Sequence, residues 1–168
     1  MDRFRAYLLV RQFLRRPESR GRARATEALM EALAERLDEP VELWATLGLL
    51  SLLDVEATEH NPDARGRMAR SQAELEGLEP ALAEALERWV VAAPEELSRV
   101  DHALVLASHL CRELPPPAGL ARELALSAGA GDAGGDRLDA ALSALSLSPE
   151  EAAALAHAAL GALAERRP

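Results

Sequence analysis

Residues 25–54 read ATEALMEALAERLDEPVELWATLGLLSLLD, and this stretch decides the fold of the chain. Its first half places Leu29, Leu33 and Leu37 four residues apart, which is the spacing of one helical face. A short acidic turn follows, and Pro40 stands at the first position of a second helix, where a missing backbone N–H costs nothing. The apolar run after it is about three helical turns long. The stretch therefore predicts two packed helices joined by a tight turn.

The composition favours helices throughout the chain. Of the 168 residues, 49% are hydrophobic and only 3% are aromatic. Alanine, leucine, glutamate and arginine dominate, and these residues have the best helix propensities. No stretch of strand length alternates between apolar and polar residues. We therefore predict an all-α protein, a single-domain bundle of about seven to nine helices.

Proline and glycine divide this single domain, residues 1–168, into four parts. A basic amphipathic helix covers residues 1–17, and a helical core follows over 18–113. The stretch AGAGDAGGD at 128–136 predicts a mobile linker, because it lacks the Gly-Lys-Ser/Thr sequence of a phosphate loop. A pair of helices completes the chain over 137–168. Capping sequences predict helix starts at Ser98 and Ser148, and the three prolines at 115–117 predict a helix end.

Charge is distributed unevenly along the chain. Residues 1–24 contain eight arginines and two acids, whereas the net charge of the whole chain is −9. We expect this basic arm either to lie on the acidic body of its own or a neighbouring chain, or to meet a phosphate-rich partner. It lacks the interleaved aromatic side chains that bind single-stranded nucleic acid, so we do not expect nucleic acid as a partner.

The cysteine content and the hydropathy give further limits. Cys111 is the only cysteine, which excludes an internal disulfide, and its apolar helical setting predicts a buried core residue. No apolar run approaches the roughly 20 residues that span a bilayer. The apolar part of the N-terminus is too short and too interrupted by arginine for a signal peptide. We therefore expect a cytoplasmic protein that does not associate with a membrane.

The four histidines give weak support for a metal site. His102 and His109 lie seven residues apart, His60 lies in a predicted loop, and His157 is alone on the last helix. A metal site needs three or more converging ligands, and helical pairs are best placed four residues apart. Cys111 lacks an activating neighbour, because His109 points about 200° away around the helix. We interpret these side chains as structural or surface residues.

Four phrases of the opening stretch follow one another in a fixed order: Glu27–Ala28, Ala32–Leu37, Glu42–Trp44 and Gly48–Leu50. In this order and spacing they resemble the HD-domain superfamily of metal-dependent phosphohydrolases, in particular small bacterial HDIG-type proteins. The phrases ERWVVAAPEE and DHALVLASHL, further along the chain, are similar to two more helices of that family. The resemblance covers about residues 20–113 and implies an HD-like helical bundle.

The resemblance also implies where a metal site would lie. The family holds a divalent metal with a histidine on the first core helix, an adjacent His-Asp pair and a later aspartate, and a further histidine can recruit a second metal. The metal then activates a bound water for attack on a phosphoryl group. In this chain the family's ligand positions correspond to Arg22, Ser51, Leu52, Ser108 and Ala93. Serine is a weak metal ligand, leucine and alanine offer no donor atom, and arginine repels a cation.

These replacements imply a scaffold without catalytic residues, metal or cofactor, and Leu52 and Ala93 would make the former site apolar. Asp54 matches only the final acid of the family's H-D-I-D variant, which is not a metal ligand. Arg22 could meet a phosphate or a carboxylate with two parallel hydrogen bonds. We therefore expect Arg22 and Asp54 to be the residues that would bind a ligand.

Three functions remain open at this point. The first is a non-catalytic binding or regulatory module, whose partner is another protein, a second copy of the chain, or a nucleotide or phosphate. The second is a helical adaptor, unrelated to the superfamily, whose basic N-terminal arm binds an acidic partner or nucleic acid. The third is a divergent phosphohydrolase that binds a divalent metal ion with substitute ligands, drawn from Asp54, His60, Asp101, His102 and His109.

Overall fold

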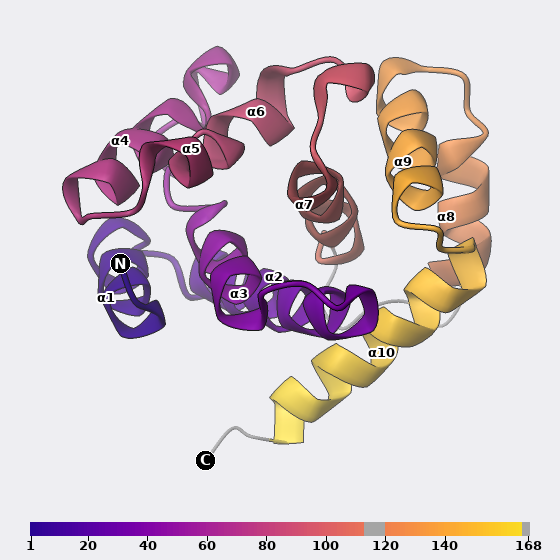
Figure 1. The fold of residues 1–168 in the computed structure, drawn as a ribbon, viewed down its shortest axis with the longest axis horizontal. Coiled ribbons are helices and arrows are strands. Elements are labelled where there is room, and N and C mark those ends of the chain that lie inside the picture. Colours follow the sequence, from indigo (N-terminus) through magenta and orange to yellow (C-terminus); the bar gives the residue numbers. More distant parts are fainter. Residues whose placement is uncertain (113–119, 166–168) are drawn as a thin grey trace.

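The computed structural model describes residues 1–112 and 120–165, and these residues form helices joined by turns (Figure 1). No strand occurs in these two ranges, which confirms the predicted all-α class. With the interrupted pair α5–α6 counted once, they form nine α-helices, within the predicted range. The helices are α1 (Arg3–Phe13), α2 (Pro17–Leu37), α3 (Val41–Leu50), α4 (Arg67–Leu75), α5 (Pro80–Ala83), α6 (Ala85–Val91), α7 (Arg99–Leu110), α8 (Leu120–Ala128), α9 (Ala133–Ala144) and α10 (Pro149–Glu165), with 3-10 turns at Pro62–Ala64 and Pro94–Glu96.

Helices α2 and α3 form the packed pair predicted from the opening stretch. α2 ends where Asp38 adopts the left-handed conformation, with φ of 56°. Gly48 then allows α3 to lie directly on α2. A Cβ atom at this position would be 2.7 Å from Cγ of Met30 and 2.9 Å from the carbonyl oxygen of Thr26. A larger side chain at Gly48 would force the two helices apart.

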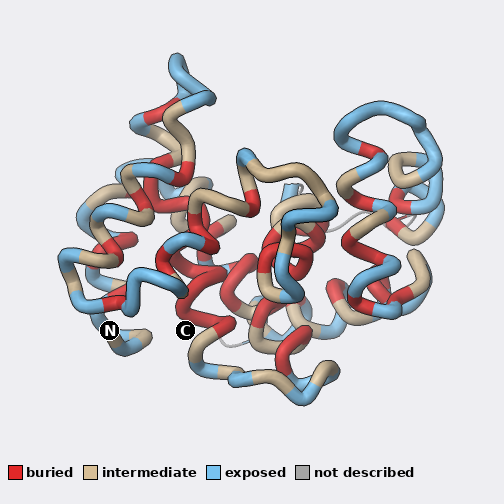
Figure 2. Tube along the Cα trace, turned by 45° about the horizontal axis from the view of Figure 1, so that its top comes forward, coloured by how far each residue is buried: buried red, intermediate tan, exposed pale blue. Residues whose placement is uncertain are grey.

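Two apolar clusters meet at this helix pair. The larger cluster joins α2 and α3 to α6, α7 and the three C-terminal helices, and it includes Leu33, Trp44 and Leu104. The smaller cluster joins α3 to α1, α4 and α5, and it includes Leu9 and Leu50. Figure 2 shows that the buried residues concentrate in the interior segments, while many loops and helix ends are exposed. The α2–α3 pair therefore supports both halves of the interior.

The basic N-terminal arm lies on acidic residues of its own chain. Arg3 of α1 forms ion pairs with Glu27 and Glu31 of α2, at 2.6 and 2.5 Å. Arg16 pairs with Glu59 at 2.6 Å. This is one of the arrangements that the charge pattern left open. The paired arginines are therefore not free to bind an acidic partner without losing these contacts.

The sequence predicts that the helix after Pro40 runs to about Leu53, that one helix extends from Pro80 toward Pro94, and that the segment before residue 128 is weakly specified, and the structure differs at each of these places. α3 ends at Leu50, because the Ser51 hydroxyl donates to the carbonyl of Gly48 and the chain continues as hydrogen-bonded turns to residue 60. The single helix predicted after Pro80 is interrupted at Glu84, which separates α5 from α6. The weakly patterned segment before the glycine-rich stretch forms α8.

The glycine-rich stretch 128–136 is less of a linker than predicted, because α9 begins within it at Ala133. Asp132 caps this helix by accepting a hydrogen bond from the N–H of Gly135 at 2.7 Å. A Cβ atom on Gly135 would lie 2.5 Å from the carbonyl oxygen of Ser127. Glycine is needed at this position because the ends of α8 and α9 approach closely. The composition alone does not distinguish a glycine with this role from one in a flexible linker.

Both predicted capping sequences are confirmed. The N–H of Ser98 donates to Asp101 at the start of α7, at 2.8 Å. Ser148 and Glu151 exchange two hydrogen bonds at the start of α10. The prolines at 115–117, which we expected to end a helix, lie outside the described residues. None of the helices in the described ranges is long and apolar enough to cross a membrane.

Substitution of Gly48 by alanine should destabilise the fold, because the new methyl group would overlap Met30 and the backbone of Thr26. Overpacking of this kind costs about 1–3 kcal/mol. Gly21, in α2, provides the control, since no atom lies within 4 Å of a Cβ atom there. Gly21→Ala should stabilise the protein by about 0.5–1 kcal/mol through its helix propensity. Urea unfolding measures both effects, and equal midpoints for wild type and G48A would contradict the close crossing.

Candidate functional site

Ser51 and Leu52, the two positions that we expected to match a His-Asp pair, both have structural contacts. Ser51 is buried, and its hydroxyl donates to the carbonyl of Gly48 at 2.8 Å. Leu52 is buried in the smaller apolar cluster. The hydroxyl of Ser51 therefore already donates its proton to a carbonyl of α3. The side chain of Leu52 has no polar atom that could bind a ligand.

Asp54 is fully buried and caps the start of α4. Its Oδ2 accepts hydrogen bonds from the backbone N–H groups of Gly66 at 2.7 Å and Ala69 at 3.3 Å. These are N–H groups of the kind that the first turn of a helix leaves without an intrahelical partner. Gly66 has φ of +87°, and a Cβ atom there would lie 2.6 Å from the carbonyl oxygen of Leu86. The carboxylate, the glycine and the helix start are therefore one structural unit.

Arg65 lies near this carboxylate, and Arg22 lies near Arg65. The charges of Asp54 and of Arg22, from α2, both act on Arg65, which immediately precedes Gly66. The Nε atoms of Arg22 and Arg65 are buried and have no hydrogen-bond partner among the described residues. This part of the interior therefore contains two guanidinium groups and one carboxylate.

Burial shifts the pKa values of Arg65 and Asp54 in opposite directions. Burial lowers the pKa of Arg65, and the charge of Asp54 opposes this shift while that of Arg22 adds to it. Burial also raises the pKa of Asp54, although the backbone hydrogen bonds and Arg65 oppose the change. Both shifts have the sign expected when charged groups are removed from water without full compensation.

Arg65 also forms one wall of a cavity between the helical core and α9. Its guanidinium lies over the indole of Trp89, with 5.7 Å from Cζ to the ring centroid, which is within the range of a cation–π contact. The cavity encloses about 220 Å³. Its other lining residues are Val90, Val105, Ser108, His109, Arg112, Gly134, Arg137 and Leu138.

Arg137 enters the cavity wall from α9 and is held by the end of α6. Its two terminal nitrogens donate hydrogen bonds to the carbonyls of Trp89 and Ala92. These carbonyls lie at a helix C-terminus, which carries a partial negative charge that suits a guanidinium. Burial lowers the pKa of Arg137. Its charge is therefore fixed in the wall by backbone contacts instead of a carboxylate.

The cavity wall carries several positive charges and lacks a carboxylate among its described lining residues. Arg65, Arg112 and Arg137 form no ion pair within 1–112 and 120–165, whereas many arginines elsewhere in these ranges do. His109 adds an imidazole, and burial together with Arg112 lowers its pKa, while Glu123 opposes that shift. The arrangement is suited to a negatively charged ligand.

The structure brings together only some of the positions predicted from the sequence. Ser108 lies in the cavity wall with Arg65, and Arg22 acts on Arg65 from α2. Ala93 is absent from that wall and precedes the 3-10 turn after α6. We expected Leu52 and Ala93 to make the former site apolar, but charged groups occupy the interior beside Asp54.

Arg65, Arg112 and Arg137, which shape the cavity, were not selected from the sequence. They come from three separate segments, at the start of α4, after α7 and in α9. No local pattern of residues connects them, so only the tertiary fold reveals that they share a wall.

The substitute metal ligands do not form a cluster. Within the part of the chain that the structure describes, no group of three or more His, Cys, Asp or Glu residues is placed to hold a metal ion. His60 is exposed, and Asp101 is fully buried in an ion pair with Arg88 at 2.6 Å. His102 is buried, and burial lowers its pKa, partly opposed by Asp101.

Cys111 is a buried core residue, as predicted. Burial raises the pKa of its thiol to about 11, although Thr26 and Arg22 oppose the shift. Because the thiolate is the nucleophilic form, Cys111 is unreactive near neutral pH.

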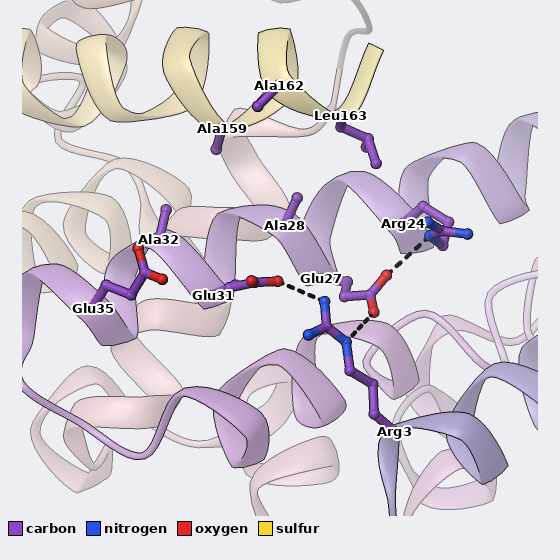
Figure 3. Close-up of a pocket in the computed structure, with 10 residues that line it drawn as sticks. All are labelled: Arg3, Arg24, Glu27, Ala28, Glu31, Ala32, Glu35, Ala159, Ala162 and Leu163. Carbon is purple, nitrogen blue, oxygen red and sulfur yellow. Dashed lines mark hydrogen bonds and ion pairs between the residues drawn. The ribbon is translucent and has the colours of Figure 1, made fainter. Parts of the chain in front are cut away.

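A second hollow, of about 190 Å³, lies between α2 and α10 (Figure 3). Its acidic residues are largely neutralised within the chain, since Glu27 and Glu31 pair with Arg3, and Glu27 also pairs with Arg24 at 3.0 Å. Glu35 is the only lining carboxylate without an ion pair among the described residues. Small side chains form the facing walls, namely Ala28, Ala32, Ala159 and Ala162. With its charges paired, this hollow is a weaker candidate than the arginine-lined cavity.

Comparison of the chain with protein-family models, with curated proteins and with solved structures finds no match.

Replacement of Asp54 by asparagine tests the buried cap through its pH dependence. Because the pKa of Asp54 is raised in the folded protein, folding disfavours its charged form. The stability of wild type relative to D54N should therefore fall as the pH rises from about 3.9, the pKa of an unfolded aspartate, through the raised value. The loss should be about 1.4 kcal/mol for each unit of increase in the pKa.

The measurement is urea unfolding of both proteins at a series of pH values from acid to neutral. Asp63 is exposed, and D63N, which removes a carboxylate outside the interior, serves as the control. If wild type instead gained stability over D54N toward neutral pH, the carboxylate would be better compensated than this geometry implies.

Proposed function

We propose that the protein is a non-catalytic binding or regulatory module built on an HD-like helical scaffold. The observation that carries this proposal is the guanidinium of Arg65 beside the buried Asp54, with the charge of Arg22 acting on Arg65. A divalent cation in that interior would be repelled by both arginines. Asp54, the carboxylate beside them, already accepts two backbone hydrogen bonds with Oδ2.

The resemblance to the HD-domain superfamily belongs to this proposal and is supported by the ordered phrases of residues 25–54. The replacement of the ligand positions by Arg22, Ser51, Leu52, Ala93 and Ser108 removes the donors that hold a metal in that family. A metal supplies the activated water on which hydrolysis there depends. Without it, the same scaffold retains the capacity to bind but not to hydrolyse.

A protein partner, or a second copy of the chain, is also part of this proposal, in a cytoplasmic setting. Phe4 and Leu8 lie one turn apart on α1 and are 69% and 48% exposed. Arg5, next to Phe4 on α1, pairs at 3.0 Å with Glu76, which caps the end of α4. The end of α4 therefore lies close to this part of α1. Exposed apolar side chains that gather at one end of a molecule support a contact surface.

The proposal predicts that the purified protein contains no stoichiometric divalent metal. Millimolar Mn²⁺, Fe²⁺ or Zn²⁺ should leave the thermal unfolding midpoint unchanged, whereas a site occupied at 100 times its Kd would add about 2.7 kcal/mol of stability. D54N, which removes the one carboxylate near the arginines, should give the same metal content as wild type. Phosphomonoesters and nucleotides should not be turned over.

Elemental analysis and a colorimetric phosphate assay measure these outcomes. One equivalent of Mn, Fe or Zn per chain, together with metal-dependent turnover, would replace this proposal with the divergent phosphohydrolase. No arrangement of the described residues favours that alternative.

A further inference from the structure

We propose that the arginine-lined cavity between α6, α7 and α9 binds a small oxyanion with at least two negative charges, such as a phosphate group. This inference rests on the proposed function in that it names the ligand of a binding module. Seven of the ten lining residues lie within 20–113, the span of the family resemblance, and α9 supplies the other three, Gly134, Arg137 and Leu138.

The first support is the sign of the charge in the wall. The chain as a whole contains 28 acidic and 19 basic residues. Even so, the described lining of this cavity contains three arginines and a histidine, and no aspartate or glutamate. Carboxylates neutralise several arginines of the N-terminal arm, as in the pairs that Arg3 and Arg16 form. Like charges gathered without a counter-charge repel one another, and a bound anion would remove that repulsion.

The second support is the set of donors that the protein leaves unused. The Nε of Arg65 is buried without a partner among the described residues, and so is the indole Nε1 of Trp89. Unpaired buried donors are costly, and although protein atoms cover these two almost completely, they make this part of the interior favour a negative charge. Ser108 adds a hydroxyl to the same wall. Arg137 contributes charge rather than free donors, because both its terminal nitrogens already bond to the end of α6.

The size of the cavity limits the ligand to a small group. Its volume of about 220 Å³ is below the range of sites for drug-sized ligands, which is roughly 300–1,000 Å³. An adjoining hollow of the same volume shares His109, Arg112 and Gly134 with it. A phosphate group therefore fits the arginine-lined part, and the adjoining hollow has room for the remainder of a small ester. The guanidinium fork matches phosphate oxygens in geometry as well as in charge.

The negative groups nearby do not cancel this charge. Glu123 acts on His109 from α8, but it is not among the lining residues. Asp132 lines only the adjoining hollow, where its Oδ1 already accepts the N–H of Gly135 at 2.7 Å. Asp54 lies beside Arg65 and accepts backbone hydrogen bonds of α4. These groups leave the cavity wall with net positive charge.

Isothermal titration of the full chain with inorganic phosphate, pyrophosphate and glycerol 3-phosphate tests the inference, and the two kinds of phosphate distinguish a free anion from an ester. We expect phosphate to bind with a Kd below about 1 mM and acetate to bind at least tenfold more weakly. Arg112 is exposed, so Arg112→Ala should fold, and it should weaken phosphate binding at least tenfold. Arg122 of α8 is exposed and outside the cavity, so Arg122→Ala should change the Kd less than twofold.

The absence of phosphate binding at 10 mM of each of the three probes, a concentration about tenfold above the expected Kd, would overturn the inference. So would equal affinities for wild type and R112A. Either result would leave the proposed function standing, because metal content and turnover decide that separately. Binding accompanied by release of phosphate from glycerol 3-phosphate would keep the site and overturn the non-catalytic proposal.

Sulfate provides a second measurement, because it stays doubly charged from about pH 8 to about pH 5.5. The pKa of His109 is lowered in the free protein, and a bound anion would favour its protonated form. Sulfate affinity should therefore rise as the pH falls through that range, and His109→Asn should remove most of the rise. A pH-independent affinity in wild type would count against this cavity as the binding site. The charged groups around His109 are Arg65, Arg112, Glu123, Asp132 and Arg137.

Discussion

The close crossing of α2 and α3 at Gly48 is the constraint on which the rest of the structure depends. The missing side chain lets Met30 and the backbone of α2 lie directly against α3. Both apolar clusters draw residues from this pair, so its spacing sets the positions of the helices on either side. It also places the end of α3, and hence the turn that carries Asp54, inside the protein. From there the carboxylate of Asp54 accepts a hydrogen bond from Gly66 at the start of α4. This bond also fixes the position of Arg65, because Arg65 is the residue before Gly66.

The distribution of arginine is the second organising feature. In an acidic chain, many arginines find a carboxylate at low cost, and Arg3 of α1 does so on α2. Arg65 and Arg137 instead rely on an indole, on helix-end carbonyls and on the nearby charge of Asp54. Burial lowers the pKa of both, which indicates that these contacts do not fully replace water. Such a cost is common where a ligand supplies the missing charge.

Local patterns in the sequence predicted what local physics decides. The leucine spacing of α2, the turn before α3 and the caps at Ser98 and Ser148 all depend on residues within a few positions of one another. The end of α3 was misplaced because the hydroxyl of Ser51 bonds back to its own helix, which an apolar run does not reveal. The glycines of 128–136 suggested a flexible linker. Gly135, in the first turn of α9, instead allows the ends of α8 and α9 to approach closely. The bond between Asp54 and Gly66 and the placement of Arg137 join distant segments, so no local pattern predicts them.

A buried carboxylate needs positive charge beside it, and the source of that charge decides what the site can do. In a metal-dependent hydrolase the charge is a cation with open coordination positions, which binds a phosphoryl oxygen and lowers the pKa of a water. Here it comes from the N–H groups at the start of α4 and from the guanidinium of Arg65. A guanidinium attracts a phosphate and donates to it, but it has no open coordination position on which to activate water. An interior of this kind suits the same class of anion without activating water, so the binding that we propose does not require hydrolysis.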